Sequence, residues 1–458
     1  MMNIKELKQR ALAGDLSALE ELRQLGVLSG NRVKYSMAPV SNAQRRLWFI
    51  DRMDQSPAYN LPAAILLEGH LNVDALEKTF REIIRRHEIL RTSFVETDGI
   101  PYQKIVQEVA FTLPVQDKSD VANQEELISA LAAEEANRCF DLSTGPLLVC
   151  RLMKLAETKY LLLFNMHHII SDGWSIAVLI SELTQLYNAF SKGLPSPLDS
   201  LKIQYKDYAV RQEQLLKGKS GEEHKAWWLD KFSGDPSFTE LPPDLKRPSY
   251  KSFNGRLYEL EFDKTIHARV NQLIQQRNVS LFMFLVTVVD ILVSKYTGKN
   301  DVTVGSPVSG REQRDLEEQI GFYVNTIPLR NMVDPSQRFC DFLEKVRCNC
   351  IEAYDHQIYP FDLLIEELNM ERDTSRNPLF ELMVSLDELN ADRLVLVGLQ
   401  TTILKPDITF SKMDLHFNFE ESAEGMKLGV IYNPDLYSFE WVERLGAHFL
   451  QLLENILT

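Results

Sequence analysis

The sequence is poor in cysteine, has no long apolar run and shows no apolar signal core in its first residues. It holds five cysteines in 458 residues, an odd number that does not suggest a disulfide framework. Its first residues, MMNIKELKQRALAGD, are charged from the start and lack the apolar core of a signal peptide. The longest apolar stretch, residues 280–293, is interrupted by Asp290 and falls short of the roughly 20 residues that a bilayer span requires. We therefore expect reduced thiols, no membrane association and a cytoplasmic location.

Dense runs of Lys and Arg are also missing. The 50 basic residues are outnumbered by 65 acidic ones, which gives a net charge of −15 spread along the chain. This balance argues against a nucleic-acid-binding surface. Cys348 and Cys350 resemble half of a metal site, but no second pair of Cys or His lies nearby at ligand spacing. We interpret them as helix residues and expect no metal site.

Mixed helix and strand patterns fill two halves of similar size. Apolar residues make up 45% and charged residues 25%, as in an ordinary globular protein. Residues 1–35 carry two short helical patterns and form an appendage that either packs on the main body or docks onto a partner. Residues 36–215 and 216–458 are the predicted lobes. The boundary is drawn where glycines and four prolines surround one short helix containing Trp227 and Trp228.

The predicted elements place strands and helices in both lobes, so the fold class is α/β (α+β). In the first lobe, strands are expected at 63–68, 91–95, 102–106, 147–154 and 159–166, and helices at 73–84 and 175–190. In the second, strands are expected at 257–262 and 302–305, a hairpin near 424–425, and helices at 267–277, 281–296, 339–354, 361–368 and 440–457. Asp98-Gly99 predicts a tight hairpin turn.

The segment NMHHIISDGWS, residues 165–175, has the most reactive composition in the chain. An apolar strand ends in His167 and His168, and a helix begins after a short turn. Because neighbouring strand residues face opposite ways, only one imidazole can enter a cleft. Asp172 can orient the turn, and the N–H of Gly173 lies near a helix start, where negative charge is favoured. A base beside an oxyanion donor suits attack on a thioester carbonyl.

This segment has two alternative interpretations. The histidines could be satisfied core residues with Asp172 as a simple helix cap, but two histidines, an aspartate and a glycine within seven residues favour chemistry. GWSIA at 173–177 also mimics the elbow of serine hydrolases. That elbow needs the serine at the sharp turn and a glycine two residues later, where this chain has Ala177.

The segment HHIISDG at 167–173 resembles the HHxxxDG signature of condensation domains of nonribosomal peptide synthetases. Further blocks that resemble this family follow in its order: SNAQRRLW at 41–48, RHEILRT at 86–92, YKDYA at 205–209, IGFYVNT at 320–326, HQIYPF at 356–361 and RDTSRNPLF at 372–380. Together they span nearly everything from residue 37 onward.

The resemblance implies two lobes like chloramphenicol acetyltransferase, set in a V with an active-site tunnel between them. His168, with Asp172 and Gly173, would form the catalytic segment, and Asp172 would act structurally by pairing with Arg311 across the tunnel. His167, Trp174 and Arg311 would support the site, and Asn325 would lie toward the acceptor. Taken alone, Arg311 would be interpreted as a solvated surface charge.

The implied activity is an acyltransferase reaction that joins a donor acyl thioester to the amine of a carrier-bound aminoacyl acceptor. Both substrates would arrive on 4'-phosphopantetheine arms of carrier proteins, from an upstream donor carrier and a downstream acceptor carrier, next to an adenylation domain. The domain itself would bind no cofactor. The initial Met and short appendage suit either a donor from a separate upstream protein or a starter domain that takes a fatty acyl group, with acyl-CoA as one source.

Three relatives of the same fold are alternatives. Heterocyclisation domains replace the histidine pair with aspartates, and epimerisation domains carry an acidic block where this chain has GFYVNT. Recruitment domains bind a partner enzyme without catalysis and usually have a damaged histidine motif. The intact motif here favours catalysis.

Overall fold

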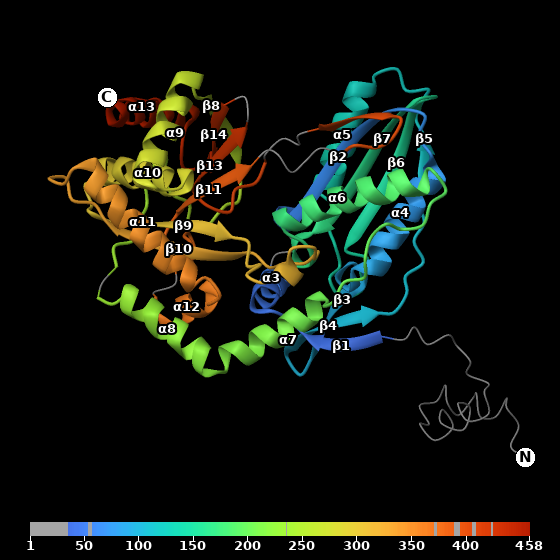
Figure 1. Cartoon of the computed structure of the whole chain (residues 1–458), viewed down its shortest axis with the longest axis horizontal. Helices are drawn as coiled ribbons and strands as arrows, with labels where there is room; N and C mark the ends of the chain where they lie inside the picture. The colour runs from blue at the N-terminus through green and yellow to red at the C-terminus, as the bar shows by residue number, and fades with distance from the viewer. Residues whose placement is uncertain are drawn as a thin grey trace, which may run out of the picture.

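The computed structural model describes residues 35–53, 57–234, 236–370, 373–388, 394–404, 409–422 and 425–458. The helices predicted within the first 34 residues lie outside this part of the chain. Two lobes lie side by side, and helices α7 (Tyr205–Leu216) and α8 (Lys219–Lys231) run between them along one edge (Figure 1).

The first lobe is built on a five-stranded sheet. Its strand order is β12 (Leu399–Leu404), β2 (Asn60–Gly69), β7 (Lys159–His167), β6 (Leu148–Ala156) and β5 (Val115–Asp117). Strand β7 is apolar at successive positions because both faces of the sheet are covered. Leu162 and Phe164 pack in the core that includes α4 (Val73–Arg86) and α6 (Gly173–Phe190), whereas Leu161 and Leu163 pack with α5 (Gln124–Ala136).

A smaller three-stranded sheet has the order β1 (Tyr35–Pro39), β4 (Ile100–Val106) and β3 (Thr92–Thr97), with η2 (Glu88–Arg91) before β3. The predicted hairpin is confirmed, since Thr97 pairs with Ile100 and both turn residues, Asp98 and Gly99, have positive φ. Helix α3 (Asn42–Met53) follows β1 directly, and η1 (Pro57–Tyr59) precedes β2.

The second lobe contains a six-stranded sheet. Its order is β10 (Asn325–Met332), β9 (Asp301–Val308), β11 (Leu382–Glu388), β13 (Leu415–Ser422), β14 (Gly425–Tyr432) and β8 (Arg256–Glu261). The lobe's helices are α9 (Lys264–Arg277), α10 (Leu281–Thr297), α11 (Phe339–Asp355), α12 (Phe361–Glu367) and α13 (Phe439–Leu457). Cys348 and Cys350 lie on α11, one exposed and one buried, as the helical interpretation predicts.

The apolar helix α10 is buried along most of its length in the core of the second lobe. Its Asp290 is buried too and accepts a hydrogen bond from the Asn331 side chain at 2.8 Å. Within the described residues, no helix meets the length and hydropathy expected of a bilayer span by itself. The joined pair α9 and α10, bent by 106° at its break, meets them together by length and composition only.

Two segments of residues 216–458 belong to the first lobe, which the predicted division did not anticipate. Strand β12 pairs with β2 over six residues and extends the first sheet. Leu316, Ile320 and Phe322 pack in the first lobe's core, as does Leu396. Sequence periodicity does not reveal such exchanges, because the partner of a strand is chosen by tertiary contacts.

Candidate active site

Strand β7 ends at the two histidines, and they have different surroundings. His167 is 3% exposed and packs edge-on against Phe140, and its Nδ1 accepts the backbone N–H of Ile169 at 3.1 Å. His168 begins the short 3₁₀ helix η3 (His168–Ile170) and lines a cavity between the lobes. Gln44 of α3 fixes the turn by donating to the carbonyl of Ile169 at 3.1 Å. One imidazole therefore faces the cavity and the other packs behind it, as the alternation of strand residues predicts.

Hydrogen bonding defines the tautomer of His168. Its Nδ1 lies 2.8 Å from the carbonyl oxygen of Ser171, which can only accept, so Nδ1 carries the hydrogen. Burial lowers the pKa of His168 well below its usual value of 6.5, and the charge of Lys412 lowers it further. The ring also contacts Phe322 edge-on, with centroids 4.9 Å apart. The imidazole is therefore neutral near pH 7, and its lone pair lies on Nε2.

Asp172 caps helix α6 and is held by five hydrogen bonds. Its Oδ1 accepts from the backbone N–H and the hydroxyl of Ser175, at 2.9 and 2.7 Å. Arg311 donates to both oxygens at 2.9 Å, and the N–H of Tyr323 donates to Oδ2 at 2.9 Å. The predicted pair of Asp172 with Arg311 is present. With its acceptor positions filled, the carboxylate holds the turn and is not free to act as a base.

The interpretation of Arg311 as a solvated surface charge is wrong, since the residue is 7% exposed and its guanidinium lies 4.3 Å from the Tyr323 ring centroid. The serine hydrolase alternative fails as well. Ser175 is fully buried, and its hydroxyl accepts the N–H of Gly321 at 3.0 Å in addition to bonding Asp172. A hydroxyl in that position cannot reach a substrate.

Gly173 is the first residue of α6, lies exposed and lines the cavity. A Cβ at this position would meet no atom within 4 Å, so the glycine leaves open space over the helix start. Backbone N–H groups at such a start attract negative charge. Trp174 is 47% exposed and donates its indole N–H to the carbonyl of Glu317 at 2.8 Å. It ties the helix start to the segment that follows Arg311.

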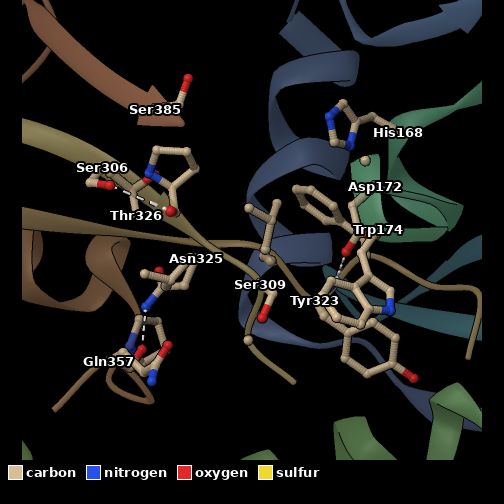
Figure 2. Close-up of a pocket in the computed structure, with 18 of the residues that line it drawn as sticks. His168, Asp172, Trp174, Ser306, Ser309, Tyr323, Asn325, Thr326, Gln357 and Ser385 are labelled. Atoms are coloured by element: carbon tan, nitrogen blue, oxygen red, sulfur yellow. Dashed lines mark hydrogen bonds between the residues drawn. The ribbon is translucent and has the colours of Figure 1, made fainter. Parts of the chain in front are cut away.

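Asn325, the first residue of β10, uses its whole side chain to hold a loop. Its Nδ2 donates to the carbonyls of Gln357 and Tyr359, both at 2.8 Å, and its Oδ1 accepts the N–H of Phe361 at 3.1 Å. The amide thereby shapes the cavity wall before α12. It lines the cavity but directs its polar atoms into the protein (Figure 2).

Several of the sequence blocks described above meet in a buried hydrogen-bond network beside this site. The Tyr205 hydroxyl donates to the carbonyl of Phe322 at 2.6 Å and contacts the Ser41 hydroxyl at 2.8 Å. Arg86 and His87 both bind Glu182, at 2.7 and 2.9 Å. These contacts link four separate blocks to helix α6 and to the segment 320–323 beside the His168 turn.

The cavity has a volume of about 1090 Å³ and takes its walls from both lobes. His168, Asp172 and Trp174 lie on one side, facing Ser306, Thr326 and Ser385 on the other (Figure 2). Many further lining residues were not predicted from the sequence, among them Tyr59, Ser385, Lys412 and His416. They lie in unremarkable local sequence, and only the folding of distant segments brings them to the cavity.

A family model for the condensation domain matches residues 34–458. The chain belongs to the condensation domain family. It is 38% identical to a component of the linear gramicidin synthase of Brevibacillus parabrevis over 99% of its length, and 36% identical to surfactin synthase subunit 1 of Bacillus subtilis (strain 168) over 91%. It covers only 9% and 11% of these relatives. Condensation domains of nonribosomal peptide synthetases form peptide bonds, and antibiotic synthases are among the relatives.

Solved structures agree with the mixed α/β fold. The X-domain in its complex with OxyB from teicoplanin biosynthesis superposes with a TM-score of 0.83 at 25% identity, over 92% of this chain and 93% of that one. The four-domain nonribosomal peptide synthetase AB3403 gives 0.81 at 20% identity, over 94% of this chain and 34% of that one. The starter condensation domain of rhizomide synthetase gives 0.77 at 20% identity, over 92% and 94%. At 20% identity, the last two show the fold alone.

Proposed function

We propose that this condensation domain joins a donor acyl thioester to the amine of a carrier-bound aminoacyl acceptor, with His168 as the catalytic residue. The donor is an L-aminoacyl or peptidyl group or, in a starter role, a fatty acyl group. The observation that carries the proposal is the neutral imidazole of His168, whose unprotonated Nε2 belongs to a ring that lines a cavity shared by both lobes.

In the proposed reaction, the acceptor amine donates a hydrogen bond to Nε2 of His168, which aims the nitrogen lone pair at the thioester carbon. The C–N bond forms, the C–S bond breaks, and the carrier thiol leaves with the proton that the amine gives up. Because the pKa of His168 lies well below 6.5, the imidazole orients the amine by accepting a hydrogen bond and does not store its proton. The N–H of Gly173 supports the developing oxyanion.

Positioning residues surround this centre. Asp172 and Arg311 fix the turn after His168, His167 packs behind it, Trp174 braces the helix start, and Asn325 shapes the acceptor side. The proposal requires the cavity to be open at both ends, so that the 4'-phosphopantetheine arms of an upstream donor carrier and a downstream acceptor carrier can enter. Acyl-CoA is an additional donor in a starter role.

The wider context is also a proposal. A volume of about 1090 Å³ suits two slender arms and their acyl groups better than one compact ligand. An adjacent adenylation domain would load the acceptor carrier, and the reaction would take place in the cytoplasm. The lobe boundary at residues 215 and 216, apart from the two later segments that pack in the first lobe, remains a prediction, as does the docking role of residues 1–35.

The test is amide formation with donor and acceptor carriers loaded separately, using aminoacyl and fatty acyl donors. His168→Ala should lower the rate at least 100-fold, because the amine loses its orienting acceptor. His70→Ala, at an exposed position outside the cavity, is the matched control and should keep the wild-type rate. Equal thermal unfolding of the three proteins would exclude misfolding, and a His168→Ala rate near wild type would refute the assignment.

The second candidate function is non-catalytic recruitment of a partner enzyme. This alternative is supported by the superposition on the X-domain, whose structure was solved in complex with OxyB. A wild-type domain that forms no amide with any loaded carrier pair, yet binds a partner enzyme of its assembly, would support recruitment over condensation.

A further inference from the structure

Lys412 lines the cavity from a loop whose backbone is fixed on both sides. Ser411 donates its N–H to the carbonyl of Phe253 at 2.8 Å, and the carbonyl of Lys412 accepts from the Asn377 side chain at 3.2 Å. Asp414 is bound by Arg247. These contacts hold the main chain at the start of β13 while the side chain projects, exposed, into the cavity.

The ammonium of Lys412 reaches across the cavity to the first lobe. Its Nζ lies 4.9 Å from the ring centroid of Tyr59, a favourable cation–π distance. Tyr59 immediately precedes Asn60, which pairs with His167 in the β2–β7 ladder. The cation is therefore beside the strand end from which His168 emerges. The lowered pKa of His168 agrees, because Lys412 is the charged group that contributes most to it after burial.

Unlike the other cations discussed, Lys412 has no carboxylate partner among the described residues. Arg311 is paired with Asp172, and Arg46 lies 3.2 Å from Asp362 across the two lobes. An exposed ammonium without a carboxylate partner can bind an anion that enters the cavity. The position therefore suits negative charge that appears only when substrate is present.

We propose that Lys412 is a further catalytic residue, whose ammonium binds the donor thioester carbonyl oxygen and stabilises the negative charge that develops there. This inference rests on the proposed function. As the amine attacks, the carbonyl π electrons move onto oxygen beside Nζ. When the C–S bond breaks they return, and Lys412 keeps its proton throughout. Reacting atoms approach within roughly 3–3.5 Å, and His168 and Lys412 line the same cavity, so a carbonyl attacked by an amine on His168 lies in the cavity that Lys412 also borders.

The charge of Lys412 should make the rate depend on alkaline pH. Although the side chain is exposed to the cavity, the protein atoms around its ammonium lower its pKa to about 8 by desolvation, and the charge of Arg46 lowers it further. The titratable and charged groups around it are Arg46 and Asp362, Tyr59, His167, His168 and His416. Near pH 7 the ammonium is protonated, and above about pH 8 it loses the proton. We expect kcat to fall through this range.

The experiment compares Lys412→Met and Lys412→Arg with wild type in amide formation between pH 6 and pH 10. Lys219→Met, an exposed position on α8, is the control for removing one lysine charge. Lys412→Met should lower kcat about 100-fold with little change in KM, as expected for a group that acts mainly in the transition state. Lys412→Arg should keep part of the rate and shift the alkaline fall upward, since arginine stays charged.

A second measurement does not depend on turnover. A pantetheine-linked phosphonate, an anionic mimic of the tetrahedral intermediate, should bind Lys412→Met at least 10-fold more weakly than wild type by calorimetry. A neutral amide of the same shape should bind both equally. Equal phosphonate affinity, or a Lys412→Met kcat within 2-fold of wild type, would overturn the proposal. So would a loss confined to substrates with acidic side chains, which would make Lys412 a side-chain subsite. An inactive wild type would instead refute the proposed function.

Discussion

The charge of Asp172 is neutralised by a single arginine, deep inside the protein. The side chains of Asp172 and Arg311 are 3% and 1% exposed, and each hydrogen bond between them is 2.9 Å long. Removing one partner of a buried pair leaves the other charge unpaired, at a cost of about 3–5 kcal/mol. We therefore expect Asp172→Asn or Arg311→Met to destabilise the fold strongly.

The double variant Asp172→Asn with Arg311→Met should recover part of that stability, because no lone charge remains. Urea unfolding of the four proteins gives the coupling between the two positions. If Asp172 acts only by holding the turn, rate should recover together with stability. Recovered stability without recovered rate would assign Asp172 a direct role in the reaction.

At the scale of elements, the segment after β9 is held against the first lobe by a turn at Gly310. This residue has a φ of +64°, and a Cβ there would meet the Tyr323 carbonyl oxygen at 2.1 Å. Gly310→Ala must push Tyr323 away and weaken the hydrogen bond that the Tyr323 N–H donates to Asp172. Gly298, at the end of α10, has a φ of +69° but no atom within 4 Å of a Cβ, so Gly298→Ala isolates the backbone strain.

We expect Gly298→Ala to cost about 1 kcal/mol of unfolding free energy without changing the rate. Gly310→Ala should cost clearly more and also slow condensation, because it displaces the support of the His168 turn. Denaturant unfolding and the condensation assay measure the two effects. Equal losses of unfolding free energy in the two variants would show that the contact with Tyr323 does not contribute to stability.

Local patterns in the sequence were enough to predict most helices and strands, and the local arrangement of His168 and Asp172 between strand and helix, because these features depend on neighbouring residues. The cap of α6 by Asp172 and the hairpin at Asp98 are of this kind. Arg311 was found through the family resemblance alone. Strand β12 and Lys412 were missed, since their partners lie hundreds of residues earlier in the chain, and hydrophobic periodicity carries no record of such pairings.

At the scale of the whole molecule, the cavity between the lobes and the packing directly behind it hold groups that resist protonation. Burial and the charge of Lys412 lower the pKa values of His167 and His416 to about 4. In the unfolded chain a histidine titrates near 6.5, so between pH 6.5 and 4 the unfolded state binds more protons than the folded one. The contribution of these histidines to the free energy of unfolding is therefore fully present above pH 6.5. It is lost progressively as the pH falls toward 4.

His167 alone should account for about 3 kcal/mol of this decline, because each unit of pKa difference corresponds to about 1.4 kcal/mol. Denaturant unfolding at intervals from pH 7 to pH 4.5 measures the slope. In His167→Phe the plot of unfolding free energy against pH should be shallower. The difference should reach about 1.4 kcal/mol per pH unit in the middle of the range, which corresponds to roughly one proton fewer taken up on unfolding. An unchanged slope would mean that His167 becomes charged without unfolding, which requires the packing around it to admit water.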